Sequence, residues 1–187
     1  MMNHRFLKWL GLIILFGFSL LIQQAWSLSI ARADLEELTT ESAKIVLGHI
    51  TAIDYQWQDQ SRKTIETRLT VSVEQYLKGS GGNSIIVTQL GGQMGDLKME
   101  IAGTPEFDVG DEVLFFLQEY HGKYWIHSIA LGAFSIITEN NGQKLIVNHL
   151  QDVELIDPDT GARVAAEKAF PIVPLHDFIS EITRYIR

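Results

Sequence analysis

The sequence predicts a mainly β domain, either an antiparallel OB-like barrel or a sandwich, with a short N-terminal helix and an amphipathic C-terminal helix. Three observations carry this prediction. Short β-rich segments recur between turn signals, apolar and polar residues alternate from Ile65 to Glu74, and no stretch alternates strands with long helices. Alternation with one polar face indicates a half-buried antiparallel strand.

Each expected strand is bounded by glycine-rich or polar segments. The strands are expected in segments 45–53, 65–74, 84–90, 97–101, 112–120, 123–130, 133–138, 144–148 and 153–156. Asn141-Gly142 predicts a hairpin, because a tight two-residue turn needs positive φ, and His121-Gly122 predicts another. Segment 91–95, which contains three glycines, and segment 103–110, which contains Pro105 between two glycines, are expected to be loops.

Helices are expected at both ends of the domain. The segment from Asp34 to Ser42 is typical of a short helix with two leucines on one side. Near the C-terminus, apolar residues recur at spacings of three and four, which predicts one buried helix face. These residues are Leu175, Phe178, Ile179, Ile182 and Ile186. Pro174 suits the first turn of this helix, where its missing N–H costs nothing.

The N-terminal segment is typical of a secretion signal. Arg5 and Lys8 precede an almost wholly apolar run, 9–22, and Ala31-Arg32-Ala33 is a small-residue cleavage site. The sequence therefore predicts a signal peptide over 1–33 and a single mostly-β domain over 34–187. The protein is expected to be exported to the periplasm or beyond the cell. Two alternatives stay open: cleavage at 25–27, and an uncleaved membrane anchor through residues 9–31, which carry no charge up to Ala31.

We expect the exported form to begin near Asp34, after the Ala31-Arg32-Ala33 site. Intact-mass measurement on protein recovered from the membrane and soluble fractions checks this. A full-length mass in the membrane fraction would instead favour the anchor.

Charge and cysteine content exclude several classes. Loss of 1–33 removes three cations and no acid, so the net charge falls from −8 to −11. Such a domain repels phosphate backbones, and nucleic acid is not expected as a partner. The absence of cysteine excludes disulfides, thiolate zinc sites and cysteine nucleophiles. A membrane partner is expected only if the N-terminal segment stays uncleaved.

A series of short motifs resembles a family of exported bacterial proteins of unknown function. The motifs are Leu77-Lys78-Gly79, Gly91-Gly92, Gly103-Thr-Pro-Glu-Phe107 with Gly110, Leu114-Phe-Phe-Leu117 and Gly132-Ala-Phe134. They match the pattern LKG…GG…GxPxFxxG…FL…GxF over about residues 44–137. The resemblance implies no activity and no catalytic residue. The strand pattern is also similar to OB and netrin-type barrels, a likeness of fold that does not fix function.

The sequence predicts no catalytic residue, metal site or cofactor. The histidines show no metal-ligand spacing, and His149 with Asp152 and Glu154 is the nearest to a cluster. Segment 157–161 lacks the ligand spacing of a calcium hand and predicts a turn. Asp108 and Asp111 are expected to solvate a turn rather than to act as acid and base.

Aromatic residues near strand ends give the candidate binding residues: Tyr55, Trp57, Tyr124 and Trp125. Exposed aromatics can stack sugars or anchor peptides, whereas buried ones pack a core. The sequence therefore favours a non-catalytic binding or accessory module of the cell envelope, with a protein or a glycan as partner. The alternative is a secreted hydrolase with a dispersed Asp/Glu/His site. A concave pocket that holds paired carboxylates, or a carboxylate and a histidine, would favour the hydrolase.

Overall fold

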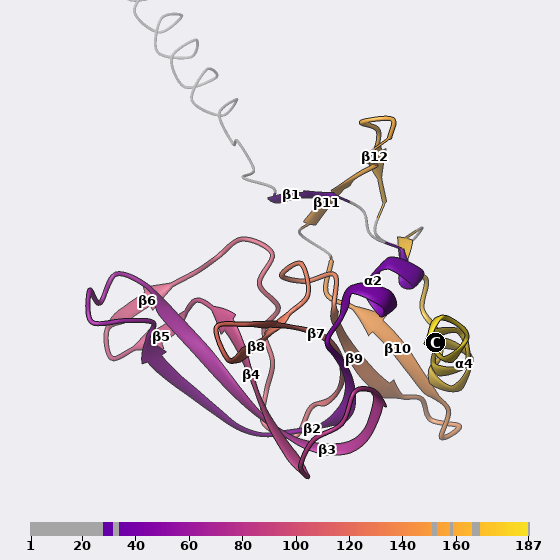
Figure 1. Cartoon of the computed structure of the whole chain (residues 1–187), viewed down its shortest axis with the longest axis horizontal. Helices are drawn as coiled ribbons and strands as arrows, with labels where there is room; N and C mark the ends of the chain where they lie inside the picture. Colours follow the sequence, from indigo (N-terminus) through magenta and orange to yellow (C-terminus); the bar gives the residue numbers. More distant parts are fainter. Residues whose placement is uncertain (1–27, 32–33, 151–152, 158, 166–168, 187) are drawn as a thin grey trace, which may run out of the picture.

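The computed structural model describes residues 28–31, 34–150, 153–157, 159–165 and 169–186. It is mainly β, with a short helix near the N-terminus and a longer one at the C-terminus (Figure 1). Most of the predicted signal peptide lies outside the described residues. Within them, no helix has the length and apolar character to cross a bilayer.

The largest sheet has the strand order β13-β10-β9-β7-β2-β3-β4-β8. Its strands are β2 (Lys44–Trp57), β3 (Ile65–Lys78), β4 (Ser84–Leu90), β7 (Glu112–Tyr120), β8 (Lys123–Ile126), β9 (Ala133–Thr138), β10 (Lys144–Asn148) and β13 (Val173–Pro174). Two smaller sheets contain β5 (Gly92–Met94) with β6 (Leu97–Met99), and β1 (Leu28–Ala31) with β11 (Val153–Ile156) and β12 (Arg163–Val164).

Five strands of the main sheet pair in a cycle. β2 pairs with β3, β3 with β4, β4 with β8, and β8 with β7, which pairs in turn with β2. The β4–β8 pairing is parallel, with Val87 opposite Tyr124. The expectation of purely antiparallel pairing was therefore wrong at this position, because β8 reaches β4 by folding back from β7 rather than through a hairpin with β4.

The strand expectations held for most segments and failed at their ends. β2 and β3 each run for 14 residues, beyond the predicted segments, because they pair with each other from Ile45 opposite Lys78 to Trp57 opposite Ile65. β8 ends at Ile126 instead of Ala130. The Asn141-Gly142 hairpin is present, but positive φ occurs at Gly142 and not at Asn141. The turn is therefore a longer loop, closed by a bond from Glu139 N to Gln143 O.

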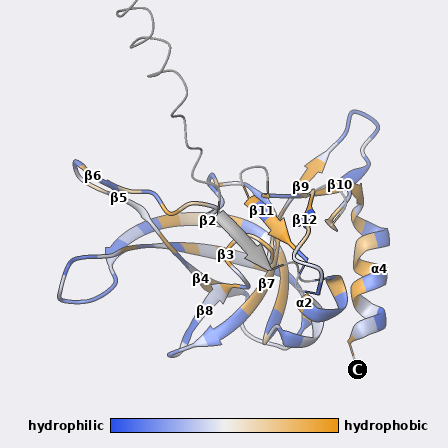
Figure 2. Ribbon diagram, turned by 90° about the horizontal axis from the view of Figure 1, so that it is seen from above, coloured by the Kyte–Doolittle hydropathy of each residue, from blue (hydrophilic) through white to orange (hydrophobic). Residues whose placement is uncertain are grey.

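Two apolar cores lie on opposite sides of the β7 region, and Figure 2 shows the apolar residues concentrated in the central strands. The first core contains Phe116 and Phe134, together with residues of both helices. The second contains Phe115 and residues of β2, β3, β4 and β8. Adjacent residues of β7 face different cores because side chains alternate along a strand.

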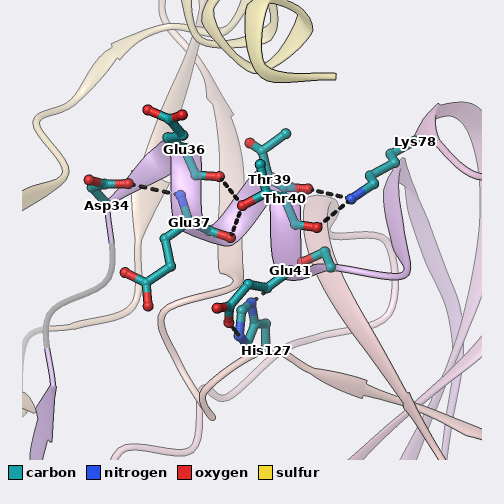
Figure 3. A network of polar contacts seen from close by, with 9 residues as sticks. Asp34, Glu36, Glu37, Thr39, Thr40, Glu41, Lys78 and His127 are labelled. Atoms are coloured by element: carbon teal, nitrogen blue, oxygen red, sulfur yellow. Dashed lines mark hydrogen bonds and ion pairs between the residues drawn. The ribbon is translucent and has the colours of Figure 1, made fainter. Parts of the chain in front are cut away.

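Helix α2 (Leu35–Glu41) has a cap at each end (Figure 3). Asp34 Oδ1 accepts a bond from Glu37 N at 2.8 Å, as an N-cap side chain does. At the other end, Lys78 Nζ donates to the carbonyls of Thr39 and Thr40 at 2.7 and 2.8 Å. A cation at this end complements both the free carbonyls and the helix dipole. Lys78 of the LKG motif thus attaches the helix to β3.

Helix α4 (Leu175–Tyr185) begins one residue after Pro174, which is the N-cap. Leu175, Phe178 and Ile182 are buried in the first core, while Ile179 and Ile186 are partly buried against it. The predicted apolar face is therefore the face that packs.

The small sheet bears on the predicted processing site. β1 pairs in parallel with β11 over four residues, from Leu28 opposite Val153 to Ala31 opposite Ile156. Cleavage after Ala33 would remove β1 and leave that edge of β11 unpaired.

Candidate functional site

A cleft of about 380 Å³ opens at the end of the molecule that carries the β5–β6 hairpin. Figures 1 and 2 place this hairpin and helix α4 at opposite ends. The walls of the cleft are formed by the ends of β2, β3 and β4 that lie near the β5–β6 hairpin, by the hairpin itself, and by the loop that leads from the hairpin to Asp108. The volume falls within the range of roughly 300–1,000 Å³ that is usual for small-molecule sites.

Two glycines let the hairpin approach the sheet. Gly92 has φ of +128°, and a Cβ there would lie 2.5 Å from the Tyr55 ring and 2.7 Å from Thr67 Oγ1. Thr67 Oγ1 also donates a hydrogen bond to Gly91 O at 2.8 Å. Any side chain at position 92 would therefore push the hairpin away from Tyr55 and reshape the cleft.

Gln89, at the end of β4, lines the cleft with a fixed side chain. Its Nε2 donates to Pro105 O at 3.0 Å, which links β4 to the loop on the opposite wall. Its Oε1 is buried and accepts no hydrogen bond, and it is the one such buried side-chain atom in the described part of the chain. A buried acceptor left unpaired costs about 1–3 kcal/mol.

The cleft carries more negative than positive charge. Lys98 Nζ lies 2.5 Å from Glu100 Oε1. The hydrogen bond between them raises the pKa of Lys98 and lowers that of Glu100, and the charge of Glu106 adds to the rise. Glu106 and Asp108 also line the cleft. A carboxylate with a lowered pKa stays ionised, so Glu100 is unsuited to act as a general acid at neutral pH.

The four predicted aromatic residues do not form one site. Tyr55 lines the cleft and its side chain is 45 % exposed. Trp57 follows it at the end of β2 and is half-buried. Tyr124 is partly buried and packs against the second core. Trp125 lines a different, more open depression with Tyr120. Of these four residues, only Tyr55 contributes to the cleft.

The structure brings together two serine–histidine pairs that resemble part of a hydrolase site. Ser42 Oγ lies 3.5 Å from His127 Nδ1, and His127 Nε2 lies 3.6 Å from Glu41 Oε2. Ser135 Oγ and His149 Nε2 lie 2.8 Å apart, and burial lowers the pKa of His149 while Asp111 opposes the shift. Ser135, however, lies within β9 between β7 and β10, where its backbone takes part in the sheet. Neither residue lines the cleft.

The other polar candidates serve local structure. Asp111 Oδ2 accepts from Asp108 N at 2.8 Å, within a turn. Asp157 Oδ1 accepts from Thr160 N at 2.9 Å, also within a turn. Glu154 pairs with Arg163, and Asp152 lies outside the described residues. In the ranges that the structure covers, no three His, Asp or Glu side chains gather as metal ligands would.

A buried histidine, His127, and a partly buried one, His149, predict a pH dependence of stability. Burial lowers the pKa of His127 and of His149 from 6.5, with Glu41 and Asp111 opposing the shifts. Figure 3 shows His127 beside Glu41, at 3.6 Å. Since the unfolded chain then binds more protons than the folded one, stability should be lost as pH falls through about 6.5.

To check this, the free energy of unfolding is measured at pH 8 and at pH 5 for the parent and for the double variant His127→Gln/His149→Gln. The variant should lose less stability on acidification. If both proteins lose the same stability between pH 8 and pH 5, the loss does not come from these two histidines.

Comparison with known proteins does not indicate a function for this chain. No protein-family model and no curated protein matches the chain.

Proposed function

We propose that this protein is an exported, non-catalytic binding module of the cell envelope, built on an OB-like barrel, with the cleft beside Tyr55 and Gln89 as its ligand site. The cyclic pairing of five strands, with one parallel pair between β4 and β8, supports the barrel. The signal-like N-terminal segment supports export.

The cleft itself carries the proposal of binding. It has the volume of a small-molecule site and presents the exposed Tyr55 beside polar side chains such as Gln93 and Glu106. The Gly91-Gly92 and Gly103–Gly110 motifs also contribute to the walls of this cleft through Gly91, Gly92, Pro105 and Phe107. Two of the motifs, which flank the β5–β6 hairpin in the sequence, thus contribute to one site.

A thermal-shift screen of the exported protein against sugars, short peptides and nucleosides tests the proposal. A ligand at 100 times its Kd should stabilise the fold by about 2.7 kcal/mol. Tyr55→Ala should abolish this shift and leave the melting temperature of the free protein nearly unchanged, because the Tyr55 side chain is 45 % exposed. Tyr120→Ala is the matched control, since Tyr120 is exposed and lies outside the cleft. A ligand shift that survives Tyr55→Ala would refute the cleft as the site.

A secreted hydrolase is the second candidate, and the Ser135–His149 contact is the observation that favours it. A neutral histidine could accept the serine proton during nucleophilic attack. Turnover of an ester or peptide substrate that Ser135→Ala abolishes would establish this function. The binding module is preferred because the cleft contains no histidine and does not include this pair.

A further inference from the structure

Strand β11 is held in place by the first core. Its residues Val153 and Leu155 are buried there, with 8 % and 0 % of their surface exposed. Side chains alternate along a strand, so these two residues share the face that packs inward. The backbone of β11 is therefore fixed against the domain, and a strand that pairs with it belongs to the fold.

β1 covers one whole edge of β11. The two strands pair in parallel along all four residues, from Leu28 opposite Val153 to Ala31 opposite Ile156 (Figure 1). On the other edge, β12 pairs only with Leu155 and Ile156. Without β1, the backbone groups on its side of β11 would lose their partners, and a two-stranded ladder would remain. Such ladders are marginally stable in water, and exposed strand edges promote aggregation.

The two candidate cleavage sites differ in what they do to β1. Cleavage after Ala33 removes the whole strand. Cleavage after Ser27, which ends the small-residue site Ala25-Trp26-Ser27, keeps the strand whole, because β1 begins at Leu28. The site at Ser27 also lies closer to the apolar run 9–22, and in a secretion signal the cleavage site follows the apolar region.

We propose that a signal peptidase hydrolyses the Ser27–Leu28 bond and that β1 is the N-terminal strand of the mature protein. One water adds across the peptide bond, which leaves a carboxylate on Ser27 of the released peptide and a free amino group on Leu28. This inference concerns processing and goes beyond the proposed function. The sequence alone favours the site at Ala33, whereas the pairing of β1 with a buried strand favours the site at Ser27.

Intact mass and N-terminal sequencing of the exported protein, recovered from cells that express the full chain, test the cleavage site. The mature chain should begin at Leu28. Ser27→Phe should abolish this form, because the site requires a small residue at its end. Ala33→Phe is the matched control and should be processed like the parent. A mature chain that begins at Asp34 or elsewhere, a full-length mass in the membrane fraction, or a Leu28 form that persists in Ser27→Phe would overturn the proposal.

A second measurement tests the role of β1 in the mature fold. Ile30→Pro/Ala31→Pro removes the N–H groups of two adjacent residues, which point to opposite edges of the strand, so one of them faces β11. The melting temperature of the exported protein should fall by about 4 °C or more.

Asn140→Pro is the control for this variant. Asn140 is exposed and is the second residue of a turn closed by the bond from Gly142 N to Glu139 O, where proline is favoured. Its melting temperature should stay within about 2 °C of the parent. If Ile30→Pro/Ala31→Pro melts like Asn140→Pro, β1 is not part of the mature fold and the proposal is refuted.

Discussion

Replacing Phe178 by alanine is expected to lower the free energy of unfolding by about 3–5 kcal/mol. Phe178 is buried in the first core, with its ring centroid 5.1 Å from that of Phe134 and 6.5 Å from that of Phe116. Truncation removes apolar contact and leaves a cavity between α4 and the sheet. For a domain of this size the melting temperature should fall by about 2–4 °C per kcal/mol. Thermal unfolding followed by circular dichroism measures the change.

Glu181→Ala is the control on the same helix, since Glu181 is exposed, and it should leave the melting temperature within about 2 °C of the parent. Phe178→Leu keeps most of the volume and should cost less than alanine. It therefore serves as the measurable variant if Phe178→Ala fails to fold. If Phe178→Ala has the same melting temperature as the parent, α4 does not pack as described.

Replacing Lys123 by methionine is expected to cost about 3 kcal/mol, because it leaves Glu66 as a buried charge without its cation. The Glu66 side chain is fully buried, and Lys123 Nζ lies 2.6 and 2.9 Å from its two carboxylate oxygens. Gln56 Nε2 also donates to Glu66 Oε1 at 2.5 Å. Lys123 is 37 % exposed, which places the expected loss at the lower end of the range for buried pairs.

A double-mutant cycle with Glu66→Gln separates the pair from its surroundings. Glu66→Gln/Lys123→Met should be more stable than Lys123→Met alone, since the stranded charge is gone. Lys98→Met is the control, because the Lys98–Glu100 pair is exposed on both sides and such pairs contribute at most about 1 kcal/mol. A loss in Lys123→Met no larger than in Lys98→Met would contradict the account. The free energies of unfolding are measured in urea for the parent, the two single variants of the pair, the double variant and Lys98→Met.

Local patterns in the sequence predicted the elements whose burial follows a simple period. Alternation located β3, and spacings of three and four located the face of α4. β6 falls within the expected strand 97–101, whereas β5 falls within segment 91–95, which was expected to be a loop because it contains three glycines. The pairing of β5 with β6 was therefore not predicted. The parallel pairing of β4 with β8 was also missed, since no local signal specifies which strand a chain end will meet.

The candidate site was predictable only in part. Tyr55 is exposed and lines the cleft, whereas Tyr124 is partly buried against the second core. Alternation alone does not distinguish the second core from solvent. Gln89 was not singled out, since an unpaired acceptor is a property of three-dimensional contacts and leaves no mark in the sequence. The cleft joins residues from Ile53 to Asp108, which only the fold brings together.

The central claim is that the cleft beside Tyr55 is a ligand site. The most direct test compares the parent, Tyr55→Ala and Tyr120→Ala by their affinity for a ligand found in the thermal-shift screen and by their free energy of unfolding. We expect Tyr55→Ala to lower the affinity by about tenfold or more. Its stability should stay within about 1 kcal/mol of the parent, because Tyr55 is 45 % exposed. Unchanged affinity in Tyr55→Ala would contradict the account.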